Sequence, residues 1–209
     1  MDKRLRGVDV YAGDGAIRWP RVKGAGYDFA FVKATQGITL QDKRWSANVL
    51  GAQQAGLVVG SYHFFEPTGD ATAQAKAFLA KVGGHENLVG QLRPVLDAEK
   101  RGGMTVRQYT DSVKAFIHVI ETEVGVTPIL YLSRDYATRQ VYGAELVACR
   151  LWLAQWQQAT PKWPIGPWVT WTFWQDSAYA TVAGMPNVGG VDTDVFAGGP
   201  DELQKLIVR

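Results

Sequence analysis

Two acidic side chains at alternate positions follow a short apolar run near the middle of the chain. Residues 94–96 are predicted to form a strand, and Asp97 and Glu99 come directly after it. Because neighbouring side chains of a strand point to opposite faces, the two acids share one face, roughly 6.5 to 7 Å apart along the strand. Like charges this close on an apolar segment repel, so one carboxyl is expected to keep its proton to a higher pH than in water.

A protonated carboxyl beside an ionised one is the arrangement that acid-assisted cleavage of a glycosidic bond requires. We expect Glu99 to be the protonated member, which donates to the leaving oxygen. Ionised Asp97 would raise the pKa of Glu99 and stabilise positive charge on the sugar. An isolated pair of this kind more often simply meets solvent or caps a helix, so further acids have to decide between the two interpretations.

Further acids occur within strand-like segments at both ends of the chain. Asp9 interrupts the alternating residues 6–11, and Asp192 lies in residues 189–196. A charge in the middle of a strand is costly to bury without a partner or a use. The alternative to a catalytic cluster is a structural set of ion pairs with Lys33 or Arg93.

The elements that must position these acids alternate between strand and helix through the first two thirds of the chain. Eight strands are expected, at residues 6–11, 27–35, 57–65, 94–96, 127–132, 151–156, 169–175 and 189–196. Helices are expected at residues 19–23, 44–55, 71–82, 105–124, 134–142 and 201–207. This alternation predicts parallel pairing with right-handed crossovers and closure into a barrel.

The expected fold class is therefore α/β, an irregular TIM-like barrel of eight strands with fewer than eight helices. It forms one catalytic domain over residues 1–209. In such a barrel the carboxyl ends of the strands build the site, and the first and last strands are neighbours. Four acids are expected to meet at that rim: Asp9, Asp97, Glu99 and Asp192.

The composition narrows the function classes. A net charge of +2 does not support nucleic-acid binding, and the absence of an 18-residue apolar run argues against membrane insertion. No signal peptide is recognisable, so we expect export by a holin, by a secretion system or with a leader that was removed. The lone Cys149 is expected to be buried. With no zinc-ligand spacing and no phosphate-cradling loop, we expect no metal and no cofactor.

The chain is rich in aromatic residues, with five of its eight Trp between Trp152 and Trp171. Aromatic rings fill cores, and they also line sugar sites; both uses remain open for the aromatic candidates. His63, inside a Tyr-His-Phe run, is expected to be packed and hydrogen-bonded rather than catalytic. The candidate substrate contacts are Tyr62, Lys33, Tyr131, Trp152, Gln155, Trp156 and Trp174.

Several short motifs, in their order and spacing, carry a resemblance across nearly the whole chain. They are GVDV at 7–10, FVKATQG at 31–37, GSYHF at 60–64, LDAE at 96–99, LWLAQW at 151–156, WQ at 174–175 and GVD at 190–192. The sequence resembles the family-25 glycoside hydrolases, the Chalaropsis-type lysozymes or N-acetylmuramidases.

The resemblance implies an irregular barrel with Glu99 as the general acid and Asp9, Asp97 and Asp192 as the other active-site carboxylates. The implied reaction is hydrolysis of the β-1,4 bond between N-acetylmuramic acid and N-acetylglucosamine in peptidoglycan. A monomeric phage endolysin or bacterial wall hydrolase, acting at the cell wall, is expected. Attack by a carboxylate and attack by the acetamido group of the substrate both remain open.

Two other functions compete with this one: a non-catalytic module on the same scaffold and a related barrel glycosidase. A non-catalytic wall-binding module is disfavoured by the intact Asp97 and Glu99. A chitin-type glycosidase is disfavoured because the longer Asp-rich strand signature of family-18 chitinases is absent.

The sequence departs from the family pattern at four positions. Tyr11 stands where Ser is common, Trp156 and Asp176 where Tyr is common, and Asp194 where Asn is common. All four carboxylates remain. The additional acid near Asp192 is expected to raise neighbouring pKa values.

Overall fold

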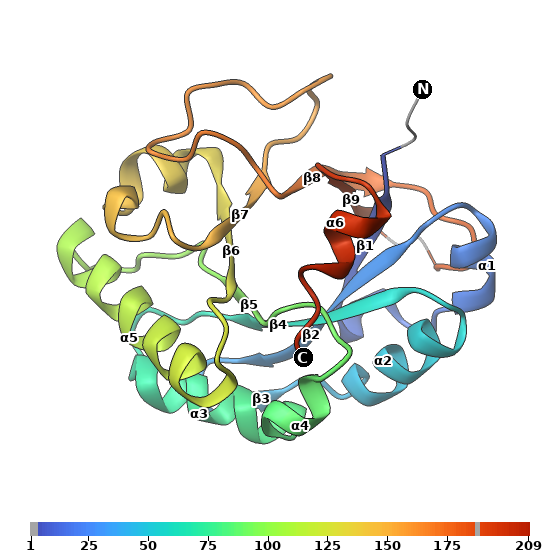
Figure 1. The fold of residues 1–209 in the computed structure, drawn as a ribbon, viewed down its shortest axis with the longest axis horizontal. Coiled ribbons are helices and arrows are strands. Elements are labelled where there is room, and N and C mark those ends of the chain that lie inside the picture. The colour runs from blue at the N-terminus through green and yellow to red at the C-terminus, as the bar shows by residue number, and fades with distance from the viewer. Residues whose placement is uncertain (1–3, 187–188) are drawn as a thin grey trace.

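Eight strands close into a barrel in the computed structural model, which describes residues 4–186 and 189–209 (Figure 1). The barrel strands are β1 (Arg6–Val10), β2 (Phe29–Gln36), β4 (Val58–Phe64), β5 (Val95–Asp97), β6 (Ile129–Ser133), β7 (Arg150–Ala154), β8 (Phe173–Ala180) and β9 (Val191–Phe196). Strand β1 pairs with both β2 and β9, which completes the closure. The predicted irregular barrel is confirmed. The short strand β3 (Leu40–Gln41), which was not predicted, pairs only with β2.

Helices surround the barrel unevenly. They are α1 (Trp19–Gly24), α2 (Trp45–Gln54), α3 (Ala71–Val82), α4 (Gly84–Leu88), α5 (Val106–Val124) and α6 (Pro200–Gln204). Short 3-10 segments occupy Ala12–Asp14 and Gly143–Glu145, and a π-helix occupies Tyr136–Gln140 within the helix predicted at 134–142. Figure 1 shows α3 and α5 side by side against one flank, with α1 and α2 on another. Helix α4 was missed by the sequence analysis.

The two longest helices have clear end signals. Helix α3 begins after Asp70, whose side chain accepts a hydrogen bond from the backbone N–H of Ala73. Helix α5 begins with a reciprocal capping box between Thr105 and Gln108. Both end at a glycine with positive φ, Gly83 at 83° and Gly125 at 75°. Every helix in the described ranges is too short or too polar to span a bilayer.

The direction of the last strand differs from a simple parallel barrel. The barrel strands β1, β2 and β4 to β8 pair in parallel, as the alternation predicted. Strand β9 runs antiparallel to both β1 and β8. It therefore presents its first residues, rather than its last, at the rim where β1 ends. Strand β8 begins at Phe173, later than expected, and continues to Ala180.

The barrel interior is filled by aromatic rings. The ring centroid of Phe31 lies 4.4 Å from that of Trp152 and 5.0 Å from that of Phe173. The centroids of Phe29 and Phe173 are 5.2 Å apart. Two further apolar clusters lie between the barrel and the helices. The C-terminal segment adds Leu203 and Leu206 to the interior cluster. Because residues 206–208 pair with the chain just before β5, this segment covers the end of the barrel where the strands begin.

One glycine makes room for this packing. Gly7 points into the barrel on the same face of β1 as Asp9, and a Cβ there would overlap the ring of Phe29. We predict that Gly7→Ala destabilises the fold by about 1 to 3 kcal/mol, because the ring has no free space to move into. The control Gly24→Ala, where an added Cβ meets nothing within 4 Å, should change stability by less than about 1 kcal/mol. Equal urea midpoints for the two variants would contradict this account of the interior.

Candidate active site

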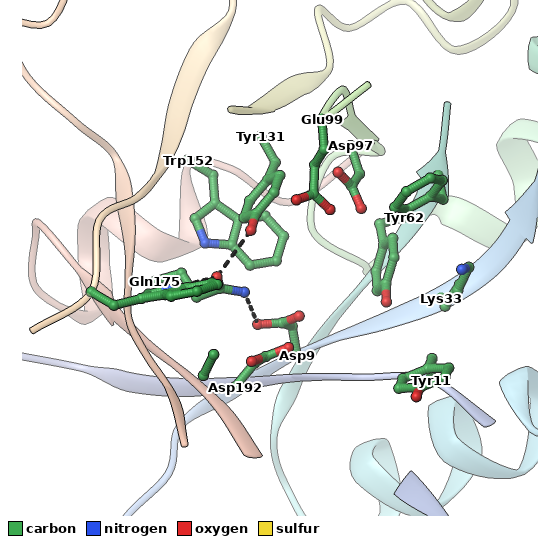
Figure 2. A pocket seen from close by; sticks show the side chains of 13 residues that line it. Asp9, Tyr11, Lys33, Tyr62, Asp97, Glu99, Tyr131, Trp152, Gln175 and Asp192 are labelled. Carbon is green, nitrogen blue, oxygen red and sulfur yellow. Dashed lines mark hydrogen bonds between the residues drawn. The ribbon is translucent and has the colours of Figure 1, made fainter. Parts of the chain in front are cut away.

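A cavity of about 370 Å³ opens at the end of the barrel where the parallel strands finish (Figure 2). Nine of the eleven predicted site residues line it: Asp9, Lys33, Tyr62, Asp97, Glu99, Tyr131, Trp152, Trp156 and Asp192. The lining is completed by Tyr11, Phe64, Gln175 and Ala178. The acids that are distant in sequence therefore do meet at one rim.

The other two predicted residues, Trp174 and Gln155, do not line the cavity, and strand alternation explains why. Along β8, Phe173 belongs to the interior cluster and Trp174 to the cluster outside the barrel. The indole N–H of Trp174 donates to the Gln155 carbonyl at 2.9 Å, and the Gln155 side chain accepts from the Lys162 backbone N–H at 2.8 Å. The prediction that these two side chains face the site is therefore corrected.

Asp9 and Asp192 lie directly opposite each other on paired strands. The antiparallel register of β1 and β9 pairs Asp9 with Asp192. Asp9 is near the end of its strand and Asp192 near the start of its own, so both reach the same rim. Figure 2 shows these two acids on one side of the cavity and the Asp97–Glu99 pair on the other.

Gln175 connects three of the lining residues and was not among the predicted contacts. Its side-chain oxygen accepts from the Tyr131 hydroxyl at 2.9 Å and from the Trp156 indole N–H at 2.8 Å. Its amide nitrogen donates to Asp9 Oδ2 at 2.9 Å. The available signal was alternation, because Gln175 is two residues after the inward-facing Phe173. This amide therefore fixes the orientation of the Asp9 carboxyl.

Asp97 and Glu99 form a hydrogen-bonded carboxyl pair. Asp97 is buried and ends β5, whereas Glu99 follows the strand and is half-buried. Burial, then the charge of Glu99, then the hydrogen bond between the two raise the pKa of Asp97 well above its ordinary value. Burial also raises the pKa of Glu99, while its hydrogen bond with Asp97 opposes that rise. Burial is therefore the largest cause of the raised pKa in both members of the pair.

The cation at this rim is not locked in an ion pair with the acids. Lys33 donates to the Gln36 side chain at 2.6 Å and has no carboxylate within 4.0 Å among the described residues. Burial lowers the pKa of Lys33. Its ammonium group lies 4.7 Å from the ring centroid of Phe64. Arg93 precedes β5 and so lies at the opposite end of the barrel. The alternative of a structural ion-pair set therefore does not describe this cluster.

Comparison with known proteins agrees with a site built from carboxyl groups. A sequence profile described as glycosyl hydrolases family 25 matches residues 8–185. The chain belongs to this family. It is accordingly a glycoside hydrolase.

Relatives in family 25 cover almost all of the chain. Lysozyme M1 of Streptomyces globisporus is 33% identical over 97% of this chain and 71% of its own length. The N,O-diacetylmuramidase of Chalaropsis sp is 27% identical, with 97% of this chain and 98% of that protein covered. Among solved structures, the bacterial lysozyme of Streptomyces coelicolor superposes with a TM-score of 0.89 at 32% identity, covering 98% of this chain and 97% of that one.

Of the four residues that were expected to depart from the family-25 pattern, two line the cavity. Tyr11 and Trp156 are lining residues, 50% and 41% exposed. Asp176 accepts from Arg6 at 3.2 Å and from the Thr193 hydroxyl at 2.7 Å. Of the four, Asp194 is the one that is fully buried.

Asp194 acts on the buried Asp9. Its Oδ1 accepts from the Trp152 indole N–H at 2.8 Å, and its Oδ2 is buried. Burial raises the pKa of Asp194 well above its ordinary value. The pKa of Asp9 is also raised well above its ordinary value, first by burial, then by the charges of Asp194 and Asp192. Burial, then the charges of Asp14 and Glu99, raise the pKa of Asp192 to about 6.

The remaining chemical groups have structural roles. His63 is buried, and its ring nitrogens meet Thr35 at 2.7 Å and Gln74 at 3.1 Å, as expected for a packed residue. Burial lowers its pKa to about 4, so it is neutral near pH 7. Cys149 is buried, as predicted. In the described part of the chain, no three His, Cys, Asp or Glu side chains are arranged to hold a metal.

Replacing Asp194 by Asn tests the coupling among the buried acids. The amide keeps an oxygen for the Trp152 N–H but removes a negative charge beside Asp9, so the pKa of Asp9 should fall. When folding raises the pKa of a carboxyl, the free energy of unfolding falls as pH rises from the unfolded to the folded pKa. The variant should therefore be more stable than its parent near neutral pH, by on the order of 1 kcal/mol per pKa unit relieved.

Urea unfolding across the acidic to neutral range measures this effect. The advantage of Asp194→Asn should shrink toward about pH 4, where the buried acids are protonated in both proteins. The exposed substitution Asp201→Asn serves as the control and should show no such dependence. A loss of stability in Asp194→Asn that is the same at every pH would show that Asp194 acts only through packing.

Proposed function

We propose that the protein is a lysozyme that hydrolyses the β-1,4 bond between N-acetylmuramic acid and N-acetylglucosamine in peptidoglycan, with Glu99 as the general acid. The observation that carries this proposal is the hydrogen-bonded Asp97–Glu99 pair, both members having raised pKa values, in the cavity at the barrel rim. A family-25 relative named autolytic lysozyme, from Clostridium acetobutylicum, is 25% identical over 93% of this chain. We expect action at the cell wall, in an endolysin or in a bacterial wall hydrolase.

Glu99 is assigned the donating role because it is the member that can reach the substrate. Asp97 is buried at the strand end, whereas Glu99 is half-buried on the cavity wall. The proton that the pair retains passes through their hydrogen bond and leaves from Glu99 to the glycosidic oxygen. Asp97 then carries the negative charge that the donation leaves behind.

The opposite wall supplies the charge that stabilises the transition state. Asp192 has a pKa of about 6, so it is mostly ionised near neutral pH, and it faces the Asp97–Glu99 pair across the cavity. A fixed carboxylate there stabilises the oxocarbenium-like sugar without having to reorient. Asp9, buried and held by Gln175, adds a polar group beside it.

Trp156 is the best-placed aromatic for a sugar ring. It lines the cavity, is 41% exposed, and its N–H is held by Gln175. Tyr131 and Trp152 are almost fully buried and form the cavity wall and floor instead. We propose that the enzyme acts as a monomer.

Glu99→Gln should reduce the rate on purified peptidoglycan by about 10² to 10⁴, because the amide cannot donate a proton to the leaving oxygen. Turbidity loss gives the rate, and mass spectrometry identifies the reducing ends. The control Glu86→Gln, on the surface, should retain full activity. Release of muramic-acid ends by the parent alone supports the proposal. Equal rates for parent and Glu99→Gln, or cleavage of chitin in place of peptidoglycan, would refute it.

The pH profile tests the shared proton. Because the acid must be protonated, kcat/KM should fall as pH rises through the raised pKa of the Asp97–Glu99 pair. The alkaline limb should therefore lie above the ordinary carboxyl range of about 4. Measuring kcat/KM on soluble glycan fragments across pH checks this. An alkaline limb at the ordinary carboxyl pKa would show that the pair holds no proton at working pH.

A further inference from the structure

A second cavity, of about 330 Å³, lies at the other end of the barrel. Its lining residues come from the starts of strands: Arg93 precedes β5, Arg150 is the first residue of β7, and Thr172 precedes β8. The catalytic cavity, in contrast, is built where these parallel strands finish. The two cavities therefore lie at opposite ends of the molecule and share no lining residue.

Two guanidinium groups share this second cavity without an acidic partner. Within residues 4–186 and 189–209, neither Arg93 nor Arg150 has a carboxylate within 4.0 Å. Arginine does not relieve such repulsion by losing its proton, because it stays charged in proteins. Both arginines line this one cavity, and burial, then the charge of Arg150, lowers the pKa of Arg93.

Arg93 also has one side-chain N–H group without a hydrogen-bond acceptor. Its Nη1 donates to the Thr127 carbonyl at 3.3 Å, which holds the side chain in place. Its Nε is buried and has no partner. Glu121 accepts a hydrogen bond from the Thr127 hydroxyl at 2.7 Å and forms no ion pair with either arginine. A buried, unpaired N–H on a charged group is destabilising, so Arg93 keeps this position although its Nε makes no hydrogen bond.

We propose that Arg93 and Arg150 form a binding site for a phosphate group at the end of the barrel opposite the catalytic cavity. A guanidinium presents a planar set of N–H donors that matches phosphate oxygens two at a time. Two such groups, with the Thr172 hydroxyl beside them, offer more donors than a carboxylate accepts. The ligand is free phosphate or a phosphodiester of a polymer, since both present the same oxygens.

Side-chain NMR of the whole protein tests this site. Adding inorganic phosphate at constant ionic strength, against chloride, should shift the Arg93 Nε–H signal saturably. The variant Arg150→Gln, at an exposed position, should weaken that binding about tenfold or more. The control Arg139→Gln removes an equal charge from a side chain that is 76% exposed elsewhere, and should bind phosphate like the parent. Hydrolysis by Arg150→Gln should match the parent, which also shows that the variant is folded.

A second titration distinguishes the sources of the phosphate group. Saturable binding of glycerophosphoglycerol as well as inorganic phosphate assigns the site to a phosphodiester polymer, and binding of inorganic phosphate alone assigns it to the free ion. Both results support the site. A response no greater than that to chloride, or equal weakening in Arg150→Gln and Arg139→Gln, would overturn it. Neither outcome depends on which glycosidic bond the enzyme cleaves.

Discussion

The structure depends on the burial of several like-charged acids at one mouth of the barrel. Asp9, Asp97 and Asp194 are each buried, with Glu99 and Asp192 half-buried beside them. In such surroundings the acids cannot all ionise, because burial disfavours each charge and neighbouring charges repel. Retained protons are the consequence. A carboxyl that keeps its proton near neutral pH can act as a general acid.

The fold holds this unfavourable cluster together by fixing each carboxyl through backbone register and neutral hydrogen bonds. Strand pairing sets Asp9 opposite Asp192, and the amide of Gln175 orients Asp9. The Trp152 indole N–H satisfies one oxygen of Asp194. Lys33, the cation lining the cavity, donates to Gln36 instead of neutralising the acids. A direct ion pair with Lys33 would lower the carboxyl pKa values and remove the proton that the proposed mechanism uses.

Strand alternation and the rule that parallel strands finish at one rim were enough to predict that Asp9, Asp97 and Glu99 converge. Asp192 was also predicted to lie at this rim, but it reaches the rim from the start of an antiparallel strand. The direction of that strand could not be predicted, because a hydrophobic pattern carries no information on strand direction. Trp174 was predicted to contact substrate, although alternation from the inward-facing Phe173 already places its side chain outside the barrel. The leading part of burial in raising both pKa values was not predictable, since it depends on how deeply each carboxyl lies in the folded chain.

The retained proton is the central claim, and carboxyl NMR titration of Asp97 and Glu99 tests it most directly. Both carboxyl carbons should titrate above the ordinary range of about 4, and in two coupled steps, because each senses the charge of the other. Asp97, the more deeply buried, should be the last to ionise completely. Two independent transitions at ordinary carboxyl pKa values would mean that the pair is fully ionised at neutral pH, which would contradict the account.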